Sequence, residues 1–189
     1  MRRLIFFGWT LLLASPVLAQ RPDVEARAER CKIAIAYADL LLSQLHDRVV
    51  FTKEGEQAYF HLSAGGWFSE DGSPSISPPS SLLRYANRRG RIDALSSCPS
   101  MTIGLKNAAR GRGVVVSRTT IQVDGIDKHD NKEVRIGITL PVMSPRKKSA
   151  ILFSSQVSGP LAAGIYAYYM RYSSQKGWIV VSSKSLAVA

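Results

Sequence analysis

From Gly113 to Val188 the chain alternates apolar and polar residues with a period of two, the period of a β-strand. The clearest run places Val134, Ile136, Ile138 and Leu140 on one face. Four other runs predict strands at residues 114–123, 150–157, 165–172 and 178–188. Because short connectors join antiparallel neighbours, the pattern predicts a five-stranded antiparallel meander.

A long amphipathic helix is predicted ahead of this sheet, over Asp23–Leu45. Its apolar residues recur at spacings of three and four and form one stripe: Val24, Ala28, Cys31, Ile35, Ala38, Leu42 and Leu45. A meander with one apolar face needs a cover, and this helix is the candidate. The predicted fold class is therefore α+β, with a long N-terminal helix packed on a C-terminal antiparallel sheet.

The segment between the predicted helix and the predicted sheet has less regular patterns. Val49-Val50-Phe51 and Gln57–Leu62 are interpreted as a hairpin around Glu54-Gly55. Residues 63–81 are rich in Gly, Ser and Pro, which predicts a surface loop carrying Trp67 and Phe68. A second helix is expected over Ser80–Arg88 with a serine cap, followed by a helical turn over Ile92–Ser97.

The first 19 residues have the pattern of a cleavable export signal. Arg2 and Arg3 precede an apolar stretch over Leu4–Leu13, and Pro16 leads to Val17-Leu18-Ala19. Small residues suit signal peptidase, so cleavage is predicted after Ala19. The alternative is a membrane anchor, but a span needs about 20 apolar residues. Gln20 is not a cysteine, so a lipoprotein anchor is not expected. We expect a soluble periplasmic or secreted protein in which residues 20–189 form one domain.

Cys31 and Cys98 are the two cysteines of the chain. In an oxidising compartment, one Cys31–Cys98 disulfide is the simplest interpretation. Cys31 also lies on the apolar stripe of the predicted helix, where its sulfur would be buried. Because the pair lacks a CxxC spacing, neither a zinc site nor a redox motif is expected.

Positive charge is concentrated between Arg84 and Arg118. Without residues 1–19 the chain holds 23 basic and 14 acidic residues, a formal net charge of +9. The concentrated segment contains one acid, Asp93, and an anion-binding surface is predicted from seven arginines: Arg84, Arg88, Arg89, Arg91, Arg110, Arg112 and Arg118. Guanidinium groups grip phosphates and carboxylates with two parallel hydrogen bonds. The alternative is a charged face exposed to solvent, which is the usual role of a run of charged residues.

The predicted partners are therefore an acidic polysaccharide, a lipid headgroup, a nucleic acid or an envelope protein. Tyr85 is the aromatic residue near the arginines, and no RNA-binding or zinc-finger signature is present. The leading hypothesis is a non-enzymatic binding module. No cofactor motif is present, and no cofactor or metal is expected.

Two other functions remain open at this point. A small hydrolase of envelope polymers would need a triad such as His61 with Ser63 and Asp39, while His46 and His129 are read as a helix end and a polar turn. An inhibitor or assembly factor would use Trp67 and Phe68 as anchors.

One strand carries an aromatic face. Tyr166, Tyr168, Met170 and Tyr172 alternate along residues 165–172, and Trp178 opens the next strand. They predict either a wall for a glycan or lipid or ordinary cross-strand packing.

The C-terminal strands resemble those of a group of uncharacterised bacterial secreted proteins. The likeness rests on four stretches: Ser149-Ala150-Ile151-Leu152-Phe153, Ser158-Gly159-Pro160-Leu161, Gly164-Ile165-Tyr166-Ala167 and Lys176-Gly177-Trp178-Ile179-Val180. It implies two strands joined by a glycine-containing turn and a final Gly-x-Trp-x-Val strand, with no activity attached. The expected outline is also similar to cystatin-like folds and to folds of the nuclear transport factor 2 type, an analogy that carries no function.

Overall fold

The computed structural model describes residues 21–53, 60–69, 75–126, 132–159 and 161–188, and these form an α+β fold built on one mixed sheet. The predicted export signal, the predicted Glu54-Gly55 turn and His129 lie outside the described residues. The helices are α1 (Arg21–Gln44), α2 (Ser80–Arg88), α3 (Ala94–Ser97) and α4 (Met101–Ala108). In the described part of the chain, no helix combines the length and apolarity of a membrane span.

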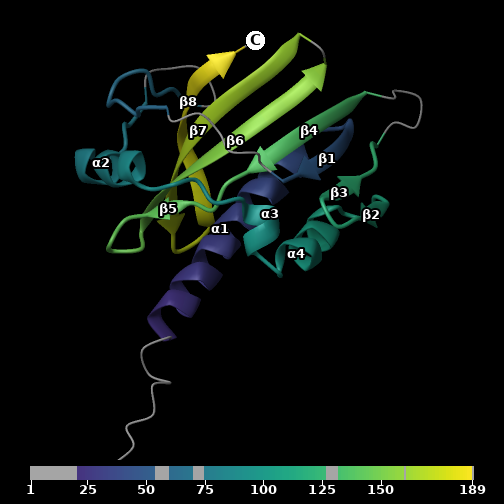
Figure 1. Ribbon diagram of the computed structural model, residues 1–189, viewed down its shortest axis with the longest axis horizontal. Coiled ribbons are helices and arrows are strands. Elements are labelled where there is room, and N and C mark those ends of the chain that lie inside the picture. The colour runs from purple at the N-terminus through teal and green to yellow at the C-terminus, as the bar shows by residue number, and fades with distance from the viewer. Residues whose placement is uncertain (1–20, 54–59, 70–74, 127–131, 160, 189) are drawn as a thin grey trace, which may run out of the picture.

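Eight strands are present among the described residues: β1 (Arg48–Thr52), β2 (Val114–Val116), β3 (Thr120–Val123), β4 (Glu133–Ile138), β5 (Val142–Met143), β6 (Ser149–Gly159), β7 (Ala162–Ser173) and β8 (Gly177–Val188). Their order in the sheet is β2-β3-β1-β4-β6-β7-β8, and β5 pairs with β6 (Figure 1). The prediction of β6, β7 and β8 as antiparallel neighbours is confirmed.

The prediction of a pure five-strand meander is wrong, because β1 is inserted into the sheet. β1 pairs antiparallel with β3, Val49 opposite Val123, and parallel with β4, Phe51 beside Ile136. Val49, Val50 and Phe51 are all buried, as a central strand requires. Both edges of β1 are therefore occupied, which leaves no edge for the predicted pairing with the described residues 60–62. The predicted strand 114–123 is instead the hairpin β2–β3 around Ser117.

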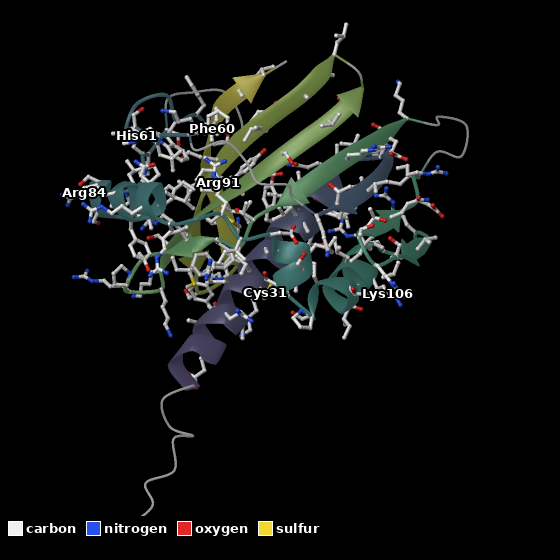
Figure 2. The ribbon with its side chains drawn as sticks, in the orientation of Figure 1. Cys31, Phe60, His61, Arg84, Arg91 and Lys106 are labelled. Atoms are coloured by element: carbon white, nitrogen blue, oxygen red, sulfur yellow. A yellow bond between two sulfur atoms is a disulfide. The ribbon has the colours of Figure 1, made fainter. Side chains whose placement is uncertain are left out.

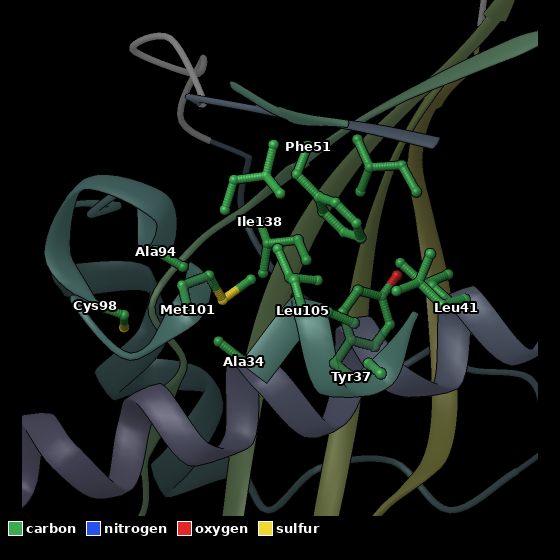
Figure 3. Packing of buried hydrophobic residues seen from close by; sticks show 14 of the residues in the cluster. Ala34, Tyr37, Leu41, Phe51, Ala94, Cys98, Met101, Leu105 and Ile138 are labelled. Carbon is green, nitrogen blue, oxygen red and sulfur yellow. The ribbon is translucent and has the colours of Figure 1, made fainter. Parts of the chain in front are cut away.

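The long N-terminal helix is confirmed and covers one face of the sheet together with α3 and α4. Tyr37 and Leu41 of α1 and Leu105 of α4 meet Phe51 and Ile138 of the sheet in one buried cluster (Figure 3). The predicted stripe is buried at Cys31, Ala38 and Leu42, whereas Ala28 is exposed, because the N-terminal end of α1 extends past the sheet (Figure 1).

The opposite face of the sheet is covered by α2 and by the segment after Phe60. Because β6 alternates, Ile151 and Phe153 point to this second face, where Leu82 of α2 and Trp67 join them. The Gly/Ser/Pro-rich loop thus lies across the sheet, and Phe68 forms a bridge to Ser183 of β8. The helix α2 occupies its predicted residues, but Pro79 stands at the N-cap and no side chain caps it.

Cys31 of α1 and Cys98, which ends α3, form the predicted disulfide. The bond joins residues 67 positions apart, and both cysteines are buried. It ties the helical layer together on one face of the sheet.

Candidate anion-binding site

The seven predicted anion-binding arginines fall into two separate groups. Arg84, Arg88, Arg89 and Arg91 lie on or just after α2, whereas Arg110, Arg112 and Arg118 follow α4 and lie around β2. Figure 2 shows Arg84 at one end of the molecule and Lys106 of α4 toward the other, with Arg91 between them. Arg89 of the first group lines one cavity, Arg110 and Arg112 of the second line another, and the chemistry of the two cavities differs.

The larger cavity, about 790 Å³, lies beside the C-terminal end of α1 and contains Arg110 and Arg112 together with His46, Arg48 and Asp124. The guanidinium of Arg112 is committed to the main chain. Its Nη1 donates to the carbonyl of Leu45 at 3.1 Å and its Nη2 to that of Asp47 at 2.6 Å. Its Nε donates to the carbonyl of Asp124.

Nη1 of Arg112 also reaches the carbonyl of Leu42, in the last turn of α1, at 3.4 Å, and together with the contact to Leu45 this makes Arg112 a cap for α1. The last carbonyls of a helix lack intrahelical partners and carry partial negative charge. The last turn of α1 contains no basic residue, so Arg112 supplies the missing cation from a distant part of the sequence. Arg110 is also paired, with Nη2 3.5 Å from Oδ1 of Asp39. The larger cavity is therefore of mixed charge, and its two predicted arginines have structural contacts.

The smaller cavity, about 280 Å³, lies between α1, α2 and the turn after β5. Arg30 of α1, Arg89 at the end of α2 and Lys147 of the turn line it, with Tyr85 and Ser144 beside them. None of its lining residues within the described ranges is acidic. Three cationic side chains from three separate elements therefore share one concave site.

The position of Arg30 is fixed by its surroundings. Its Nε donates to the carbonyl of Pro141 at 2.7 Å, which orients the guanidinium from one side. Burial first, and then the positive charges of Arg89 and Arg27, lower the pKa of Arg30 from its ordinary value. Arginine keeps its proton in proteins, so Arg30 is a charged group that is partly removed from water and lies near a second cation, Arg89.

Arg89 and Lys147 are positioned by local structure. The Arg89 guanidinium lies 4.8 Å from the centre of the Tyr85 ring, a cation–π distance. Lys147 has a left-handed backbone, with φ of 53°, in the turn between β5 and β6. Glycine or asparagine is favoured at such a position, yet the chain places there a lysine that lines the cavity.

The other predicted arginines do not line the smaller cavity. Arg91 packs 4.1 Å from the centre of the buried Phe153 ring, and Arg84, Arg88 and Arg118 are exposed. Sequence reasoning missed Arg30 and Lys147, which lie outside the concentrated segment. The run Arg146-Lys147-Lys148 in a predicted connector was the signal that pointed to Lys147.

Two residues of the predicted hydrolase triad, Asp39 and Ser63, contact other partners. Asp39 pairs with Arg110, and Ser63 Oγ accepts from Lys184 Nζ at 2.7 Å. His46 and His61 are both exposed. Of the two predicted partner anchors, Trp67 is buried, with 3% of its surface exposed, whereas 48% of Phe68 is exposed. In the ranges that the structure describes, no cluster of three or more His, Cys, Asp or Glu could hold a metal ion.

In comparisons with known proteins, no family model, curated protein or solved structure matches the chain.

Proposed function

We propose that this protein is a non-enzymatic binding module that grips an anionic group in the cavity formed by Arg30, Arg89 and Lys147. The observation that carries the proposal is the gathering of three cations in one concave site without an acid among its described lining residues. Arginine and lysine side chains bind phosphate, sulfate and carboxylate through charge-assisted hydrogen bonds. Arg30 is partly buried, and partial removal from water strengthens its interactions relative to those of an open charged surface, whereas Arg89 and Lys147 are exposed and accessible to a ligand.

The wider surface supports a polymeric or clustered anion. Arg84 and Arg88 are exposed on α2, and Arg146 and Lys148 flank Lys147 in the same turn as the cavity. A chain bearing repeated negative groups would contact the cavity with one group and these side chains with others. Acidic polysaccharide, anionic lipid headgroups and nucleic acid share this chemistry. We place the protein outside the cytoplasm, because disulfides persist in oxidising compartments.

The test measures binding to heparin, to vesicles containing phosphatidylglycerol and to single-stranded DNA, each at two salt concentrations. Binding to at least one of these probes is expected to weaken as salt rises, because the contacts are electrostatic. The double variant Arg89→Ala/Lys147→Gly removes two of the three cations, and glycine preserves the left-handed turn at position 147. This variant is expected to lose most of the affinity.

A matched control removes the same charge at the other end of the molecule. Lys106 and Arg118 are exposed and lie on α4 and in the β2–β3 turn. The variant Lys106→Ala/Arg118→Ala should retain nearly all the affinity if the cavity is the site. Equal losses in the two variants would show that net charge alone drives binding. Salt-insensitive or absent binding to all three probes would contradict the proposal.

A further inference from the structure

A third cavity, about 250 Å³, lies between the C-terminal half of α1 and strands β7 and β8, and it has a different chemistry. Tyr37, Leu40 and Gln44 line it from α1, and Tyr168, Val180 and Ser183 from the sheet. No lining residue in the described ranges is charged. The cavity therefore presents aliphatic groups and tyrosine rings with an amide and a hydroxyl group among them.

Three tyrosine rings form a row next to this cavity. The ring centres of Tyr37 and Tyr168 are 4.6 Å apart, and those of Tyr168 and Tyr166 are 6.2 Å apart. Tyr166 lies over Gly164, where an added Cβ would meet the phenol oxygen at 2.5 Å. The glycine thus allows the Tyr166 ring to lie close to the sheet. Part of the aromatic face predicted from residues 165–172 is therefore an ordered row on the α1 side of the sheet.

Hydrogen bonds connect two tyrosines of this row to the polar side chain of Gln156 on β6. Gln156 Nε2 donates to the phenol oxygen of Tyr168 at 3.2 Å and to that of Tyr37 at 3.4 Å. The two hydroxyls also hydrogen-bond each other, which provides an acceptor for one phenol proton and leaves the other to be accepted outside the pair. Ser154 Oγ lies against the Tyr37 hydroxyl, yet it is buried and makes no well-formed hydrogen bond within the described residues.

Buried polar groups in proteins are nearly always hydrogen-bonded, so the remaining phenol proton of this tyrosine pair, which lines the cavity, indicates a missing partner there. Burial raises the pKa of both Tyr37 and Tyr168, so both remain neutral phenols that can donate. The missing partner must be uncharged, because the lining offers no counter-charge for an ion removed from water. It must also carry an apolar face that fits the tyrosine rings and the side chains of Leu40 and Val180.

We propose that this cavity binds one ring of an uncharged carbohydrate. A sugar ring combines an apolar face of C–H groups with hydroxyls at its rim. The apolar face would lie on the tyrosines, and the hydroxyls would bond Tyr168, Gln44 and Ser183. Small-ligand sites have this composition, with mostly apolar and aromatic walls and a few polar groups that fix orientation. The proposal is independent of the anion-binding site, which lies between other elements.

The experiment titrates the protein with glucose, N-acetylglucosamine, maltotriose and tri-N-acetylchitotriose, followed by amide chemical shifts in NMR spectra. At least one sugar is expected to give saturable shifts in α1, β7 and β8. The variant Tyr168→Phe keeps the ring and removes the hydroxyl, and affinity should fall about fivefold for the loss of one hydrogen bond. Leu40→Trp fills the mouth of the cavity and should abolish the shifts.

Two controls separate the sugar site from other effects. The unfolding free energy of each variant shows whether it is folded, and Leu40 is partly exposed, so its replacement leaves the core in place. The pair Arg89→Ala/Lys147→Gly should bind the sugar as the original protein does. The proposal is overturned if no sugar gives saturable shifts, if Leu40→Trp binds unchanged, or if only alkyl probes such as octanol occupy the cavity.

Discussion

Gly104 of α4 lies directly against Ile35 of α1, so that a Cβ built on the glycine would meet Cγ2 of Ile35 at 2.6 Å and Cγ1 at 2.9 Å. The contact explains why α4 can approach α1 closely enough to share one buried cluster with it. Cγ1 and Cγ2 can move only by rotation about the Cα–Cβ bond, and a helix restricts isoleucine strongly to one rotamer about that bond.

Replacing Gly104 with alanine is therefore expected to destabilise the protein by about 1–3 kcal/mol through overpacking. Denaturant unfolding followed by circular dichroism measures the change. Gly90→Ala is the matched control, since no atom lies within 4 Å of an added Cβ there. Combining Gly104→Ala with Ile35→Ala should cost less than the sum of the two single changes, because the second removes the clash. Strict additivity would contradict this account.

The Cys31–Cys98 disulfide is expected to contribute roughly 2–4 kcal/mol to the free energy of unfolding, mainly by restricting the unfolded chain. Denaturation with and without a reductant gives this difference. The variant Cys31→Ala/Cys98→Ala should match the reduced protein and should no longer respond to reductant. A double variant as stable as the oxidised protein would show that the bond adds nothing.

Substitution of Arg112 tests its role as the cap of α1. Arg112→Lys keeps the charge but loses the planar fork that reaches several carbonyls at once, and a loss of about 2 kcal/mol is expected. Arg110→Ala removes an exposed ion pair nearby and should cost less than about 1 kcal/mol. Hydrogen exchange should be faster in the last turn of α1 in the lysine variant. Equal effects of the two changes would argue against specific capping.

Tyr37 gives the protein a predictable response to alkaline pH. Burial raises its pKa well above the ordinary value, so the folded state keeps the phenol proton after the unfolded chain has lost it. Stability from this group is thus complete at neutral pH and declines as pH rises above about 10, the ordinary tyrosine pKa. Unfolding free energies between neutral and alkaline pH should fall less steeply for Tyr37→Phe than for the original protein. Parallel profiles would exclude Tyr37 as a cause.

Much of the fold follows from local patterns. The boundaries of β6, β7 and β8 lie within a few residues of those predicted, because each strand alternates over its own length and adjoins its neighbours through short turns. The helix α1 was equally readable from its apolar stripe. The position of β1 was not predicted, because its partners β3 and β4 are distant in sequence. The continuous apolar run Val49-Val50-Phe51 was the signal of a strand buried on both faces.

The candidate site could be predicted less completely from the sequence than the fold. Density of arginine along the chain identified Arg89 but also Arg112 and Arg91, whose contacts with carbonyls and with the Phe153 ring depend on folding. Arg30 was not predicted as a site residue, because on α1 it lies among charges of both signs and not in a run of arginines. Its contribution arises from the carbonyl of Pro141 and from the approach of α2, which no spacing in the sequence encodes.

The insertion of β1 between β3 and β4 has a consequence for how the chain folds. Residues 48–52 must wait for residues 120–123 and 133–137 before either edge is paired, so the centre of the sheet is made of contacts remote in sequence. Folds dominated by such contacts form slowly, because loop closure precedes the gain from pairing. During synthesis from the N-terminus, β1 is thus an apolar strand with two open edges until β3 has been made. During that interval α1, which is local and adjacent, is the element available to shield Val49 and Phe51 from association with other chains.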